Sequence, residues 1–174
     1  MALTIDSPTI RELVVAAMRT KLGEITIANG YHFEVGVESV FDLADAPTSQ
    51  ADLPSITLIQ GVETVEFSAA QKRCTLEVIV AFQDDFAESS GNTTAGYTRQ
   101  KKTQDFLGDI QRCLANGFGV LVPKQPDGAT EETMIARCIE QQNSLNLTMP
   151  ETGLHGDVLY NVFYQRSPTD PRLH

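Results

Sequence analysis

The stretch Cys74-Thr75-Leu76-Glu77-Val78-Ile79-Val80-Ala81-Phe82 has the clearest apolar alternation in the chain. Successive side chains of a β-strand point to opposite faces, so every second residue from Cys74 to Phe82 would share one buried face. The other face also carries apolar residues, among them Ile79 and Ala81. This pattern predicts a central strand, or a strand that meets a partner.

Similar but weaker patterns surround this stretch. Alternating apolar residues predict a strand from Gly30-Tyr31 to about Phe41, and a short strand over 56–59 follows Pro54. We expect Gly61 to end that strand and a further one to run from Val62 to Phe67. Two longer strands are predicted near the carboxyl end, over about 133–148 and 154–166, and residues 120–122 form a short apolar patch.

Two segments have helical periodicity. Residues 10–22 place apolar side chains along one stripe, and we expect Ser7 to be the N-cap, Pro8 the first helical residue and Gly23 the terminator. The second helix is predicted over about 99–116, with Gly117 closing it.

The predicted order is therefore helix, four strands, helix, two strands. Helices too few for repeated βαβ units favour an α+β fold, a mainly antiparallel sheet packed by two main α-helices. The 174 residues suit a single domain over 1–174. Its flexible loops are expected at about 42–54, 84–98 and 117–131, with a loose tail over 167–174.

Composition restricts the partners. The net charge is −10 and the isoelectric point is near 4.6, which makes a DNA-gripping surface improbable because phosphate binding needs a basic footprint. Neither a signal peptide nor an apolar run of transmembrane length is visible, so we expect an intracellular protein that does not enter the membrane. The three cysteines form no Cys-x-x-Cys pair, which favours buried free thiols over a metal site.

Catalytic signatures are weak. Gly91 to Gly96 has phosphate-loop spacing, but Tyr97 stands where the lysine is needed, so a flexible loop is the better interpretation. Asp84, Asp85 and Glu88 could attract a divalent cation, although adjacent acids at a strand end are more often simply solvated. No Gly-x-Ser-x-Gly elbow occurs, and His155 with Asp157 is a poor acid–base pair. We therefore predict no catalytic, cofactor or metal site.

Several local patterns occur together in this order. They are the helix 10–22, Gly30-Tyr31, Leu53-Pro54-Ser55-Ile56-Thr57-Leu58 with Gly61-Val62-Glu63, the strand 74–82, Asp105-Phe106-Leu107-Gly108-Asp109-Ile110, and Tyr164 followed by Ser167-Pro168-Thr169-Asp170-Pro171. In these features most of the chain resembles the tail terminator (tail completion) proteins of long-tailed bacteriophages, the lambda minor tail protein U-like family.

The resemblance implies a structural virion protein without catalytic activity or cofactor. Such proteins form a hexameric ring on the last ring of tail-tube subunits, stop tube growth and supply the head-joining surface. The implied partners are further copies of the chain, the tail-tube protein and a head-completion or connector protein. DNA would pass through the ring without specific binding. The location would be the head-proximal end of the tail, after synthesis in the host cytoplasm.

Loops that order on assembly and acidic residues that repel DNA suit such a ring. The residues expected at loop contacts are Asp84, Asp85, Phe86, Gly91, Gly96 and Tyr97, and those expected at an acidic lumen are Glu63 and Glu66. Two alternatives remain open: another head–tail connector or stopper ring protein, and a small α+β enzyme or ligand-binding domain whose site is unrecognised.

Overall fold

The predicted central strand is present as β3 (Lys72–Asp85). In this computed structural model, which describes residues 7–45, 53–67, 71–85, 99–123, 131–146 and 153–167, β3 pairs antiparallel with β2 (Ser55–Phe67) and with β6 (Gly153–Arg166). Val78 faces Gln60 in one neighbour and Tyr160 in the other. The alternation from Cys74 to Phe82 therefore predicted its place in the sheet correctly.

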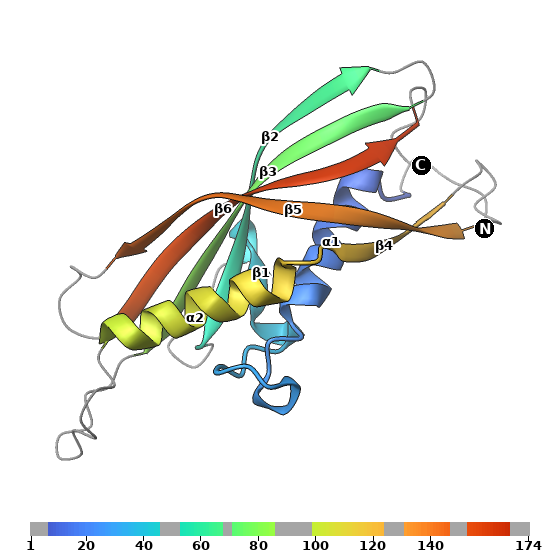
Figure 1. Ribbon diagram of the computed structural model, residues 1–174. Helices are drawn as coiled ribbons and strands as arrows, with labels where there is room; N and C mark the ends of the chain where they lie inside the picture. Colours follow the sequence, from blue (N-terminus) through green and yellow to red (C-terminus); the bar gives the residue numbers. More distant parts are fainter. Residues whose placement is uncertain are drawn as a thin grey trace, which may run out of the picture.

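The sheet has six strands in the order β1-β2-β3-β6-β5-β4. It is twisted, and β2, β3, β6 and β5 run through its centre (Figure 1). The strand β5 (Glu131–Asn146) pairs antiparallel with β6, and β4 (Phe118–Pro123) pairs antiparallel with the start of β5. Of the described strands, only the short β1 (Val40–Asp42) is parallel to its neighbour, β2. The fold is α+β, with a mainly antiparallel sheet and two main helices in a single domain, as predicted.

Both helices pack on the same face of the sheet. Helix α1 (Ile10–Leu22) lies against β4, and α2 (Arg99–Leu114) lies along β6 and β5 (Figure 1). The helix-facing residues of β3 and β6 are buried in register, as in the pairs Leu76–Val162 and Val80–Val158. Phe106 of α2 joins this core, with its ring centroid 4.9 Å from that of Phe82. No described element covers the opposite side, which we call the uncovered face.

Helix α1 begins at Ile10, two residues later than the predicted first helical residue, Pro8. Its N-cap is Thr9, whose hydroxyl accepts from the backbone N–H of Glu12 while the Glu12 carboxylate accepts from the backbone N–H of Thr9. The prediction of Ser7 as the cap was therefore wrong, because this capping box satisfies two donors at once. The predicted end at Gly23 is confirmed.

The strand predicted from Gly30 to Phe41 is wrong except at its end. Residues 37–39 form a 3₁₀ turn, and β1 begins only at Val40. Phe33 and Val35 are buried as the alternation indicated. However, the N–H groups of His32 and Phe33 donate to the Asp109 carboxylate of α2, so no neighbouring strand takes them.

Two further predictions need correction. Gly61 does not end a strand, because β2 is continuous and accommodates it in a β-bulge between Gln60 and Glu63. The apolar patch over 120–122 is part of a strand, β4, so the order is helix, three strands, helix, three strands. Gly117 closes α2 in a left-handed conformation (φ 68°), as predicted.

Candidate functional site

The predicted contact residue Asp84 lies near the end of β3 and is buried. Its carboxylate is 2.6 Å from the Lys102 ammonium of α2, so this acid links the sheet to the helix. Asp85 is the last residue of the same strand. The other predicted contact residues, Phe86, Gly91, Gly96 and Tyr97, lie outside the described residues.

Glu63, predicted in an acidic lumen, is at the β-bulge and points to the helix-covered side. Its carboxylate accepts from the Tyr164 hydroxyl at 2.9 Å and lies 3.3 Å from the Arg166 guanidinium. Arg11 of α1 approaches the same carboxylate at 3.8 Å. Burial, together with the neighbouring Glu63 charge, raises the pKa of Tyr164. Glu63 therefore joins α1, β2 and β6 as a partly buried counter-ion.

Glu66, the second residue predicted in the lumen, has a different environment. It is exposed on β2 and faces Arg73 of β3 in the sheet register. Successive side chains of a strand point to opposite faces, and Glu63 and Glu66 are three residues apart, so they lie on opposite faces of the sheet. The structure does not bring the two acids together.

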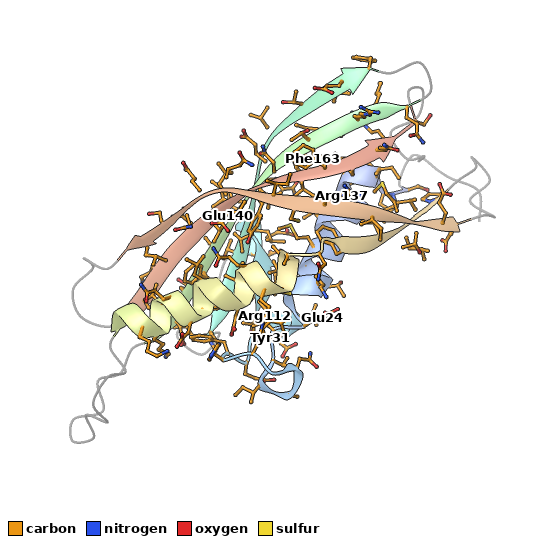
Figure 2. The ribbon with its side chains drawn as sticks, in the orientation of Figure 1. Glu24, Tyr31, Arg112, Arg137, Glu140 and Phe163 are labelled. Atoms are coloured by element: carbon orange, nitrogen blue, oxygen red, sulfur yellow. The ribbon has the colours of Figure 1, made fainter. Side chains whose placement is uncertain are left out.

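Asp109 organises a cluster that sequence reasoning missed. The residue is only 1% exposed. Its carboxylate accepts a hydrogen bond from the backbone N–H of His32 at 2.7 Å and contacts the Nδ1 of the His32 imidazole at 2.9 Å. Arg112, one turn further along α2, donates to the Gly30 carbonyl and stacks over the ring of Tyr31 at 4.1 Å (Figure 2). The available signal was an acidic residue on the apolar stripe of the predicted helix.

The His32–Asp109 pair has the contacts of a catalytic dyad, since a carboxylate orients an imidazole. Here the same carboxylate also holds two backbone N–H groups of the segment before β1. Its geometry thus accounts for the position of residues 30–33 against α2. This is a structural role that requires no substrate.

Metal and thiol chemistry finds little support in the described part of the chain. No group of three or more His, Cys, Asp or Glu residues there is placed to hold a metal ion. The three cysteines are free, and burial raises the pKa of each thiol, that of Cys138 to about 12. Thiolates would be scarce near neutral pH, so these sulfurs are poor nucleophiles.

Two of the hollows on the described surface lie beside charged side chains. One, of about 410 Å³, lies between α1 and the turn into β4 and is lined by Lys21, Glu24 and Phe118 among others. The second, of about 240 Å³, lies on the uncovered face and includes His155 and Asp157. The two hollows are thus on opposite sides of the sheet.

Exposed apolar side chains gather at the two edges of the sheet. Val62 and Phe67 of β2 are 66% and 79% exposed, and Leu121 of β4 is 58% exposed. Ile135 and Ile139 of β5 are exposed by more than half as well. Next to them, Arg137 of β5 lies beside its register partner Phe163 of β6 (Figure 2). These edges are the candidate interface.

Comparison with known proteins finds likeness among solved structures and not among families or curated proteins. No protein-family model matches the chain, and no curated protein matches it either. A chain in the structure titled "Virion of native gene transfer agent (GTA) particle" is similar, with a TM-score of 0.43 and 12% identity over 87% of this chain and 97% of that chain. Likeness at this level assigns no function.

None of the described helices is both long and apolar enough to span a membrane.

Proposed function

We propose that this protein is a structural component of a phage-like virion, a tail terminator that forms a ring on the end of the tail tube. The ring, a hexamer by the family resemblance, ends tube growth and provides the surface that joins the head. It acts without catalysis or cofactor. Its partners are further copies of the chain, the tail-tube protein and a head-completion protein.

The observation that carries the proposal is the pair of open sheet edges. Among the described residues, no further strand pairs with either edge, and each edge is lined by exposed apolar side chains, among them Val62 on β2 and Leu121 on β4. Such edges readily pair with another chain, and monomeric proteins usually protect them. A protein built to assemble through these edges explains why they are long and apolar.

The charge supports a passage for DNA rather than a binding site. A net charge of −10 gives each subunit a field that repels phosphate. In a gel-shift assay near physiological salt, the protein is therefore expected to leave double-stranded DNA unshifted. A shift that depends on added salt in the manner of counter-ion release would contradict this part of the proposal.

The deciding experiment measures the mass and shape of the purified protein, alone and mixed with tail tubes. Sedimentation velocity and negative-stain microscopy should show rings with a central hole, or particles seated on one end of a tube. Rings that bind a connector but never a tube would favour the connector or stopper alternative. A persistent monomer indifferent to tubes would count against ring assembly and leave the enzyme or ligand-binding alternative.

A further inference from the structure

The two edges of the sheet are stepped. On one side, β1 covers β2 only beside Ile56–Leu58, so β2 forms the edge from Ile59 to Phe67. On the other side, β4 covers β5 only beside Glu131–Ala136, so β5 forms the edge from Arg137 to Asn146. In each case the rest of the long strand has no further strand partner in the described part of the chain; on β2, Arg11 of α1 donates to the Gly61 carbonyl at 3.4 Å.

The steps lie at opposite ends of the sheet. Thr64 of β2 pairs with Thr75 of β3, Thr75 with Phe163 of β6, and Phe163 with Arg137 of β5, so these four residues form one row across the sheet. The part of β5 that β4 covers comes before Arg137 and therefore lies on the side of this row where β2 ends at Phe67. The strand β4 therefore protrudes at the end where β2 is uncovered. The strand β1 protrudes at the other end, where β5 is uncovered (Figure 1). One edge is thus the counterpart of the other.

We propose that successive copies of this chain join edge to edge, with β4 of one copy pairing with the open part of β2 of the next. The β1 strand of the second copy then lies beside the open part of β5 of the first copy. In this arrangement β4 of the first copy and β1 of the second lie end to end, between β5 of the first copy and β2 of the second. This inference rests on the proposed ring, for which it names the contact.

Strand directions make the pairing feasible. Four antiparallel pairings in succession separate β2 from β4, so the two run in the same direction, and their contact is a parallel pairing. β1 is parallel to β2 and hence antiparallel to β5. When β4 of one copy begins where β1 of the next copy ends, Leu121 of the first copy lies beside Val62–Thr64 of the next. Leu121 is exposed on the uncovered face, like Val62, so the contact buries apolar surface.

The contact is heterologous, because one patch meets a different patch on the next copy. Repetition of such a contact gives a ring if the rotation between copies closes, and an open filament if it does not. Its occupant is a second copy of this chain because the match is between two features of the same molecule: two protruding strands and two recesses at corresponding levels. A two-fold dimer would instead pair like edges, β2 with β2 or β5 with β5, and would give homodimer cross-links in place of a mixed dimer.

Chemical cross-linking distinguishes these arrangements. Val62→Cys and Leu121→Cys are prepared separately, one of them isotopically labelled so that the three possible dimers differ in mass, and mixed with a short bismaleimide. We expect the mixed dimer to exceed both homodimers, and the double variant to give a ladder of linked copies. The wild-type chain, whose native thiols are hindered by burial, is the control and should give little product.

Homodimers in equal or greater yield than the mixed dimer, or no product above the wild-type level, would overturn the proposed contact. Both substitutions fall on side chains more than half exposed, so thermal unfolding should remain close to that of the wild type. This melting measurement separates a lost contact from a lost fold.

A second pair of variants tests the contact in the assembled protein. Val62→Lys should weaken self-association by at least about tenfold in sedimentation velocity, because it places a charge in a buried contact. Ile27→Lys is the matched control, since Ile27 is 64% exposed but lies on a turn away from both edges, and it should leave association unchanged.

The failures are distinguishable. Rings that persist in Val62→Lys and give no mixed cross-link would overturn this contact while the proposed function stands. Mixed cross-links in open chains that never cap a tube would uphold the contact and overturn the terminator function.

Discussion

At the residue scale, Asp109 combines deep burial with a full set of partners. A buried carboxylate is costly unless hydrogen bonds satisfy it, and here two backbone N–H groups and the His32 imidazole do so. Arg112 adds a longer ion pair at 3.5 Å. The segment before β1 is therefore held by one side chain rather than by strand pairing.

Replacing Asp109 by Ala should lower the free energy of unfolding by about 3 kcal/mol, because two backbone donors lose their acceptor in the protein interior. Urea unfolding measures the change. Glu24→Ala is the control: Glu24 pairs with Lys21, its side chain is 50% exposed, and a loss below about 1 kcal/mol is expected. Equal losses in the two variants would contradict the assigned role of Asp109.

Cys138 makes stability depend on pH in the alkaline range. Burial raises its pKa from 9.0 to about 12, so the folded state keeps a proton that the unfolded state loses. The Cys138 thiol contributes fully to the free energy of unfolding below pH 9. This contribution declines as the pH rises toward 12, by at most about 1.4 kcal/mol per pH unit.

The measurement compares urea unfolding between pH 8 and about 11 for the wild type and Cys138→Ala, within the range where a thiol titrates. The variant should lose stability less steeply as pH rises, even if it begins from a lower value. Parallel slopes would show that the Cys138 thiol does not control this range. Tyr160, whose pKa burial also raises, is unchanged in both proteins.

At the scale of elements, the turn from α2 into β4 depends on one glycine. Gly117 has a φ of 68°, and a Cβ built there would come within 2.2 Å of the Ala136 carbonyl oxygen of β5. Both the left-handed conformation and this close approach require glycine. The turn brings β4 alongside β5, so it also builds one of the two steps.

Gly117→Ala should destabilise the protein by more than about 2 kcal/mol, through backbone strain and a clash with the neighbouring strand. Its matched control is Gly108→Ala in the middle of α2, where a Cβ meets no atom within 4 Å. That change should stabilise by about 0.5–1 kcal/mol, since alanine favours helix over glycine. Thermal unfolding of the two variants tests the contrast, and a neutral Gly117→Ala would refute it.

At the scale of the whole molecule, the proposed ring brings together copies that each carry a net charge of −10. Assembly must then overcome repulsion between subunits, while apolar edges supply the attraction. The electrostatic part is screened by salt and the apolar part is not.

Self-association should therefore strengthen as sodium chloride rises from about 0.01 to 0.3 M, because the Debye length shortens from about 30 Å to less than 10 Å. Sedimentation velocity at fixed protein concentration measures the change. Assembly that weakens with salt would indicate that ion pairs, rather than apolar edges, hold the copies together. Val62→Lys offers a useful comparison, as it removes one negative unit of net charge and one apolar contact together.

The sequence predicted the elements with strong periodicity. The central strand, the two carboxyl-terminal strands and both helices were recognised because each element displays its buried face in its own residues. Ile79 and Ala81, the apolar residues on the second face of β3, lie on the uncovered face. The strand proposed after Gly30 failed, because alternation reports which side chains are buried and not which groups accept the backbone N–H donors.

The candidate interface could be predicted only in outline. The family resemblance predicted assembly into a ring, yet Glu63 and Glu66 were grouped although the structure places them on opposite faces. Ion pairs such as Glu63–Arg166 join residues distant in the chain, and no local pattern announces them.

By itself, then, the sequence determined the α+β class, the acidic charge and the positions of the long strands, since these follow from composition and local periodicity. The tertiary structure alone decided that Asp109 replaces a strand partner, that β2 bends through a bulge, and that β1 and β4 protrude at opposite ends. Those features depend on register between strands far apart in the chain, and register exists only once the sheet has formed.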